Sequence, residues 1–126
     1  MTQSTKKKHI LYVEDDEIAA NIGRHILGFF DDVIVTYSST GYGALEAYNP
    51  GDYDLLFVDL GLPDISGVEL VQMIKKQYKS CPPTVAITAH VTPDDGPIRQ
   101  IDKIYVKPLT FDMAKEIFRL LDTETL

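Results

Sequence analysis

The chain has 126 residues, 44% of them apolar and 25% charged, and a formal net charge of −7. This length and composition are typical of one soluble domain that folds without disulfides or structural metals. The negative charge argues against direct nucleic-acid binding, and no apolar run has membrane-spanning length. The single cysteine, Cys81, cannot form an internal disulfide and is interpreted as structural, which favours a reducing compartment.

The N-terminal segment is basic but contains no signal for secretion. Lys6, Lys7 and Lys8 are followed by no apolar signal core. We therefore expect a cytoplasmic protein whose residues 1–7 form a flexible tail. One domain fills the sequence, with its core at about 9–121.

Strands and helices are predicted to alternate along the chain. Apolar runs predict five strands, at 8–13, 32–37, 55–59, 84–88 and 104–106. Apolar residues at helical spacing predict helices after the first, second, third and fifth strands, beginning near Asp16, Gly41, Ser66 and Phe111. The first helix carries the apolar stripe Ile18, Ile22, Ile26 and Phe29. This alternation implies a parallel sheet with helices on both faces.

The third strand ends in a carboxylate. Four consecutive apolar residues, Leu55 to Val58, precede Asp59 without polar alternation, which is typical of a central strand buried on both faces. Asp59 then lies at the carboxyl end of the strand, where ligands bind in open α/β sheets. A cap of the following turn is the alternative role for this aspartate.

Polar residues also follow the other strands. Because the carboxyl ends of parallel strands meet at one edge, these side chains are expected to converge. Several carboxylates in one place repel one another unless a cation offsets the charge. Oxygen ligands favour magnesium, and no histidine or cysteine pair has zinc-like spacing. The residues at the strand ends are Glu14, Asp15, Asp16, Asp59, Thr88 and Lys107.

This set of residues fits phosphoryl transfer. Lys107 and Thr88 can each bind a phosphoryl oxygen, and Asp59 is the expected acceptor, giving an aspartyl phosphate. Each residue has another interpretation when taken alone. Thr88 is then an ordinary strand residue, Lys107 a solvated end, and the acidic triplet a helix cap.

The chain is similar to the receiver domains of bacterial two-component response regulators. The resemblance extends from about His9 to Leu121, and its four motifs are 10–16, 55–67, Thr88-Ala89 and Lys107-Pro108. It implies a flavodoxin-like (βα)5 doubly wound fold with strand order 2-1-3-4-5. Thr88 and Lys107 are only 107 − 88 = 19 positions apart, fewer than is usual in the family. We therefore expect a short or remodelled fourth helix.

The resemblance also implies roles for the acidic residues. Asp59 is the expected phosphoacceptor and a metal ligand. Asp15 is the expected direct magnesium ligand, Glu14 acts through water, and Asp16 lies outside the site. The backbone carbonyl of Gly61 completes the ligand set, and Mn²⁺ is an expected substitute for Mg²⁺.

Further roles follow from the same resemblance. Thr88 is the expected switch hydroxyl, and Tyr105 is the aromatic residue whose rotamer follows it. Lys107 is expected to pair with the phosphoryl group, next to a cis bond to Pro108. The positions that tune the lifetime of the aspartyl phosphate are Gly61 and His90, although His90 also fits an exposed loop histidine.

The expected activity is signalling rather than turnover. A partner histidine kinase or histidine phosphotransfer domain donates the phosphoryl group, and the receiver switches conformation, with self-catalysed transfer and slow autodephosphorylation. It then controls a downstream protein or passes the phosphate on. We expect a monomer or weak dimer that binds neither nucleic acid nor membrane.

Three alternatives belong to other classes. A pseudo-receiver binds partners without phosphorylation, but it would normally lack one of the key residues, all of which are present. A haloacid dehalogenase-like hydrolase has a second aspartate two positions after the nucleophile, where this chain has Gly61. A flavodoxin-like cofactor binder needs a phosphate loop after the first strand, where this chain has an acidic triplet.

Overall fold

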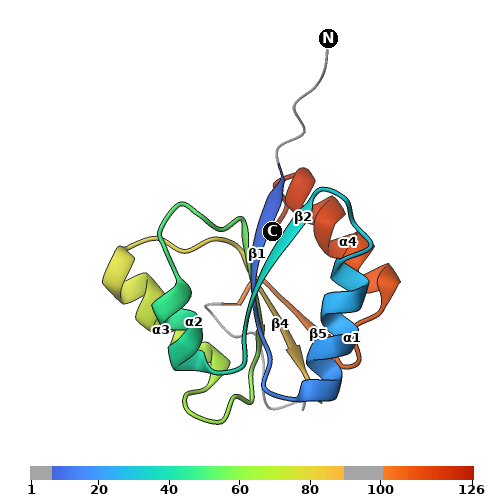
Figure 1. The fold of residues 1–126 in the computed structure, drawn as a ribbon. Helices are drawn as coiled ribbons and strands as arrows, with labels where there is room; N and C mark the ends of the chain where they lie inside the picture. The colour runs from blue at the N-terminus through green and yellow to red at the C-terminus, as the bar shows by residue number, and fades with distance from the viewer. Residues whose placement is uncertain (1–6, 90–100) are drawn as a thin grey trace.

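The structure is a computed structural model that describes residues 7–89 and 101–126 (Figure 1). Three of the expectations above therefore lie outside the described residues. They are the tail over residues 1–6, the role of His90, and the short fourth helix between the fourth and fifth strands.

Five parallel strands form one sheet in the order β2-β1-β3-β4-β5, which confirms the predicted order and fold class. Three strands have the predicted bounds, whereas β2 lies one residue later and β5 starts one residue earlier. The bounds are β1 Lys8–Val13, β2 Val33–Ser38, β3 Leu55–Asp59, β4 Thr84–Thr88 and β5 Lys103–Val106.

Each of the four described helices begins at a side chain that caps its first amide groups. Ser66 and Glu69 form a reciprocal capping box at the start of α3, as the sequence pattern of a cap predicts. No helix within the described residues is long and apolar enough to cross a membrane. The helices, each with its N-cap, are α1 Glu17–Leu27 (Asp16), α2 Gly41–Ala47 (Thr40), α3 Gly67–Tyr78 (Ser66) and α4 Phe111–Asp122 (Thr110).

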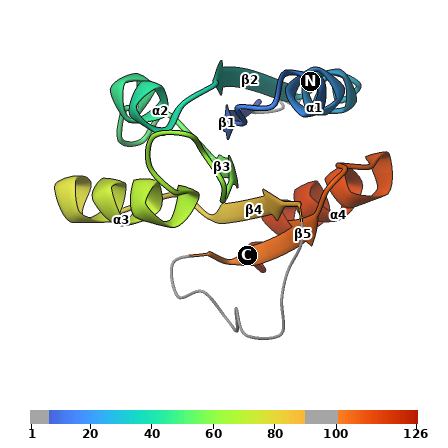
Figure 2. The same ribbon diagram turned by 90° about the horizontal axis from the view of Figure 1, so that it is seen from below.

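The helices cover the sheet in two layers. Helices α1 and α4 lie on one side, and α2 and α3 on the other (Figures 1 and 2). Strand β3 contributes to both cores, because Leu55 and Phe57 face α1 and α4 while Leu56 and Val58 face α2 and α3. All four side chains are at most 1% exposed. Burial of such side chains stabilises the fold by about 1.5–3 kcal/mol each, which fixes the strand that leads to Asp59.

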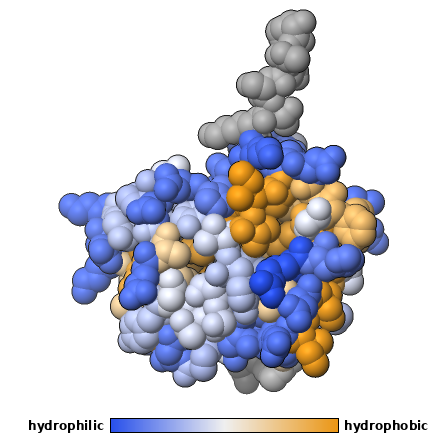
Figure 3. All heavy atoms as spheres, in the orientation of Figure 1, coloured by the Kyte–Doolittle hydropathy of each residue, from blue (hydrophilic) through white to orange (hydrophobic). Residues whose placement is uncertain are grey.

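The apolar stripe of α1 does not coincide with its buried face. The buried residues of this helix are Ala20, Gly23 and Leu27, whereas Ile18 is 72% and Ile22 43% exposed. Small residues face the sheet because a Cβ at Gly23 would lie 2.1 Å from the hydroxyl of Tyr12. In Figure 3 the apolar surface gathers on the side of α1 and α4, and the opposite side is mostly hydrophilic.

Candidate functional site

The carboxyl edge of the sheet brings together side chains from three strands. Glu14 and Asp15 follow β1, Asp59 ends β3, and Lys107 follows β5. Lys107 is anchored there because its amide donates to the carbonyl of Thr88 at 2.7 Å, which continues the pairing of β5 with β4. Parallel strands in this order thus converge on one charged cluster.

Lys107 lies between two buried carboxylates. Its Nζ is 2.9 Å from Oδ2 of Asp59, 2.8 Å from Oε1 of Glu14 and 3.0 Å from Oε2 of Glu14. The side chains of Glu14 and Asp59 are only 1% and 7% exposed. A charge pair this deep is costly to dehydrate and is retained where geometry and hydrogen bonds compensate it.

The backbone after Asp59 is packed closely against the carboxylate. The amide of Gly61 donates to Oδ1 of Asp59 at 3.0 Å. A Cβ at Gly67 would lie 2.5 Å from the carbonyl oxygen of Asp59 and 3.0 Å from Cα of Leu60, so the first turn of α3 rests on this backbone. Both oxygens of Asp59 therefore have a fixed partner, Gly61 for one and Lys107 for the other.

Burial and hydrogen bonding shift the pKa values of Glu14 and Asp59 in opposite directions. Burial raises the pKa of Glu14 to about 7, although the hydrogen bond from Lys107 opposes the rise. Burial acts on Asp59 in the same direction, but hydrogen bonds from Lys107 and Gly61 outweigh it and keep the pKa of Asp59 below its ordinary value. Asp59 is therefore ionised at neutral pH, as a nucleophile must be.

The same cluster fits a hard divalent cation. One oxygen each from Glu14, Asp15 and Asp59 lies within 4.8 Å of the others. Oε1 of Glu14 is buried and accepts no hydrogen bond within the described residues, although Lys107 lies close to it. Three carboxylates against one lysine leave an excess of negative charge, and an all-oxygen donor set suits magnesium. Because Asp15 is exposed, a cation held by this cluster would be open to water and substrate oxygens.

The remaining predicted site residues lie on β4 and β5. Thr88 ends β4, half-buried, one residue beyond the Ile87 that pairs with Asp59 in the register. Tyr105 lies on β5, and its hydroxyl donates to Glu116 of α4. Glu116 was not predicted, because nothing in the sequence pairs a helix glutamate with a strand tyrosine 11 positions away. The bond between Lys107 and Pro108 is cis, which confirms that expectation.

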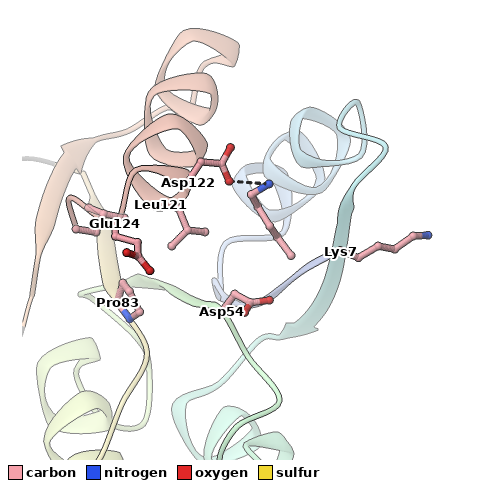
Figure 4. A pocket seen from close by; sticks show the side chains of 8 residues that line it. Lys7, Asp54, Pro83, Leu121, Asp122 and Glu124 are labelled. Carbon is pink, nitrogen blue, oxygen red and sulfur yellow. Dashed lines mark ion pairs between the residues drawn. The ribbon is translucent and has the colours of Figure 1, made fainter. Parts of the chain in front are cut away.

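A cavity of about 520 Å³ lies at the opposite edge of the sheet (Figure 4). It is lined by Lys8 at the start of β1, by Pro83 before β4, and by Leu121 and Asp122 at the end of α4. Lys8 crosses it to pair with Asp122 at 3.1 Å. None of the predicted site residues lines this cavity, so the candidate site is the charged cluster and not this cavity.

Known proteins match this chain over most of its length. The family model described as response regulator receiver domain matches residues 10–109. The aerobic respiration control sensor protein ArcB of Escherichia coli is 35% identical over 106 residues, which are 81% of this chain and 14% of ArcB. Transcription factor prr1 of Schizosaccharomyces pombe is 32% identical over 83% of this chain and 20% of its own length.

Solved structures agree with the sequence matches. The response regulator TrrA of Thermotoga maritima, solved in complex with Mg(2+)-BeF, is 29% identical, with a TM-score of 0.77 over 90% of this chain and 98% of TrrA. The chain spans at most about a fifth of the length of the two curated relatives named above. These relatives include bacterial and fungal proteins, so the expectation of a bacterial source is not established. From the family match and the five-stranded fold, the chain belongs to the response regulator receiver domains of two-component systems.

Proposed function

We propose that this receiver domain accepts a phosphoryl group from a partner phosphohistidine onto Asp59. The observation that carries the proposal is the buried carboxylate of Asp59, held between the amide of Gly61 and the ammonium group of Lys107. A carboxylate oxygen attacks phosphorus while the phosphorus–nitrogen bond breaks and the imidazole leaves. The new acyl phosphate stores the signal as a covalent change at the carboxyl edge of the sheet.

Magnesium is the proposed cofactor, with manganese as a substitute. Asp15, Asp59 and the backbone carbonyl of Gly61 would hold the cation directly, and Glu14 would hold it through water. Asp16 lies outside this set, because its side chain caps α1 by accepting from the amide of Ile18 at 3.0 Å. The bound cation would neutralise charge on the phosphoryl oxygens during transfer.

Lys107 and Thr88 are the proposed phosphoryl ligands. Lys107 pairs with Glu14 and Asp59 in this structure, and a phosphoryl oxygen on Asp59 offers it a new partner in place of a carboxylate oxygen. The hydroxyl of Thr88 would bind a second phosphoryl oxygen. This change is the proposed switch, and the ring of Tyr105 would follow the movement of Thr88.

The environment of Gly61 bears on the lifetime of the acyl phosphate. A Cβ at this position would meet only Oδ1 of Asp59, at 3.9 Å, so the space around Gly61, beside the carboxylate, is open. Water can reach an acyl phosphate through this opening, which supports slow autodephosphorylation. We propose Gly61 as a lifetime-tuning position, together with His90, which lies outside the described residues.

The exposed face of α1 supports a protein donor. Ile22 and Ala19 border the site directly, beside Glu14, Lys107 and Pro108. Ile18, 72% exposed, extends this apolar border by one turn. A partner that brings a phosphohistidine to Asp59 must cover this surface. A histidine kinase or histidine phosphotransfer domain is therefore the proposed partner, in the cytoplasm, with a downstream protein as the receiver of the signal.

Intact-mass measurement after incubation with magnesium and acetyl phosphate tests the proposal. One phosphoryl adduct is expected on the natural chain and none on Asp59→Asn. Asp54→Asn is the matched control, because Asp54 lies at the other end of β3 and should leave the adduct unchanged. Absence of the adduct from the natural chain would instead support a pseudo-receiver that binds partners without phosphorylation.

A further inference from the structure

The connection between β3 and α3 is attached to a second helix, α2. Oδ1 of Asp64 accepts from the amide of Gly41 at 2.9 Å, and Oδ2 accepts from the amide of Tyr42 at 2.8 Å. These amides belong to the first turn of α2, where backbone donors have no partner within the helix. One carboxylate from a distant loop therefore caps α2, in addition to the local cap from Thr40. Figure 2 shows this connection passing beside α2.

Apolar packing supports the same contact between the loop and α2. Ile65 is 8% exposed and belongs to the core between the sheet and α2 and α3. A Cβ at Gly41 would lie 2.4 Å from Cγ1 of Ile65, so the absence of a side chain there lets α2 approach the loop. The hydrogen bonds of Asp64 thus form on a close backbone approach that only glycine permits.

The attachment lies in the segment that connects Asp59 to α3. The residues between Asp59 and Gly67 form one short connection, and the amide of Gly67 donates to the carbonyl of Leu60 at 3.0 Å. That bond and the Gly61 amide fix the start of the connection, whereas Asp64 fixes its middle. Asp64 itself is exposed, and the amides of Tyr42 and Gly41 hold the pKa of its carboxyl below the ordinary value.

We propose that Asp64 is a positioning residue that, through the N-terminus of α2, holds Gly61 in place against Asp59. It touches neither the phosphoryl group nor the cation. Its effect is to keep the Gly61 amide on Asp59 and the Gly61 carbonyl on the cation side. Only the cation part of this inference rests on the proposed function. By linkage, events at Asp59 also alter the first turn of α2.

Hydrogen exchange of the Gly61 amide in magnesium-free protein tests the positioning directly. Asp64→Ala should raise the exchange rate of this amide about tenfold, because a loosened loop opens more often. Thr40→Ala is the matched control, since it removes the local cap of the same helix, the bond to the Gly43 amide at 2.9 Å, and leaves Asp64 in place. Exchange at Gly61 should be unchanged in that control.

Magnesium affinity, measured by titration calorimetry, gives the second readout. Asp64→Ala should weaken binding about tenfold, as the loss of an outer contact of a metal site does. Asp64→Asn separates charge from positioning, because it removes the negative charge but keeps one amide-accepting oxygen. It should recover part of the affinity and of the Gly61 protection, and it also serves if the alanine variant folds poorly.

Two results of the exchange experiment would overturn the inference. One is an unchanged Gly61 exchange rate in Asp64→Ala, and the other is an equal increase in Thr40→Ala. If Asp64→Asn bound magnesium as weakly as Asp64→Ala, the loss of affinity would come from the lost charge alone. This result would also contradict the positioning role. If the natural chain takes up no phosphoryl group, the proposed function fails, while the exchange experiment still decides the role of Asp64.

Discussion

Both edges of the sheet hold a lysine against two carboxylates, yet they differ in burial. At the amino edge, Nζ of Lys8 lies 2.6 Å from Asp32 and 3.1 Å from Asp122, whose side chains are 36% and 61% exposed. At the carboxyl edge, the two partners of Lys107 are 1% and 7% exposed. The two carboxylates that pair with the lysine are therefore close to solvent at the amino edge and buried in the protein interior at the carboxyl edge.

This difference separates a structural ion pair from the candidate site. The Lys8 hydrogen bond holds the pKa of Asp32 below its ordinary value, and both carboxylates at this edge are accessible to solvent. At the carboxyl edge burial raises the pKa of Glu14 to about 7, and one of its oxygens accepts no hydrogen bond within the described residues. Asp15 adds a third carboxylate there. The proposed chemistry thus depends on excess charge and burial, and not on a lysine–carboxylate triad alone.

Removal of each lysine should give the largest contrast between the two edges. Lys107→Met leaves buried carboxylates without their cation and is expected to lower the free energy of unfolding by about 3 kcal/mol. Lys8→Met leaves carboxylates that are exposed to solvent, so it should lower the free energy of unfolding by at most about 1 kcal/mol. Urea titration at pH 7.5 without magnesium measures both values. Similar losses in the two variants would show that burial does not distinguish the edges.

Two glycines allow the same contrast in packing. Gly67→Ala places a Cβ 2.5 Å from the carbonyl oxygen of Asp59, and overpacking of this kind should cost about 2 kcal/mol and lower phosphoryl uptake. Gly51→Ala, before β3, meets nothing within 4 Å and suffers only from its φ of 86°, so it should cost about 1 kcal/mol and leave uptake unchanged. Unfolding curves and intact mass report the two effects. Normal uptake in Gly67→Ala would mean that the Asp59 backbone tolerates displacement.

Cation binding should depend on one exposed aspartate and not on its neighbour. Asp15→Asn is expected to weaken magnesium binding at least about tenfold, because it removes the negative charge of a proposed direct ligand. Asp16→Asn should change the affinity less than about twofold, since an asparagine oxygen still caps α1. Titration calorimetry with magnesium measures both. Equal losses would move the acidic pair to other residues.

The smallest expected effect is the acid dependence of the amino edge. Because the folded pKa of Asp32 is lowered, its contribution to stability is present above the unfolded pKa and is lost as pH falls through the folded value. Solvent screening limits this contribution to less than about 1 kcal/mol. Asp32→Asn should therefore lower stability slightly at pH 6 and hardly at pH 2.5. A larger loss at the lower pH would reverse the sign.

The sequence was sufficient to predict the sheet. Uninterrupted apolar runs mark strands buried on both faces, and β1, β3 and β4 have the predicted bounds. The acidic residues, Asp59 and Lys107 also converge as expected, because parallel strands end at one edge. Capping chemistry was equally readable, since Ser66 and Glu69 form a local box whose members lie three positions apart.

Individual contacts between distant segments were less readable. The convergence of Lys107 with Glu14 and Asp59 was predicted from the strand order, but their direct ion pairs, across 93 and 48 positions, were not. The apolar stripe of α1 predicted a helix correctly without revealing that Ile18 is exposed, because periodicity alone does not say which face is covered. The cap that Asp64 provides for α2, 22 and 23 positions away, has no local signature either.

Locating the modified residue tests the central claim most directly. The chain is treated with magnesium and acetyl phosphate, reduced with borohydride to convert an acyl phosphate to homoserine, and sequenced by tandem mass spectrometry. We predict homoserine at position 59 in the treated sample only. Homoserine at another carboxylate, such as Asp15, or no homoserine at all, would contradict Asp59 as the phosphoacceptor.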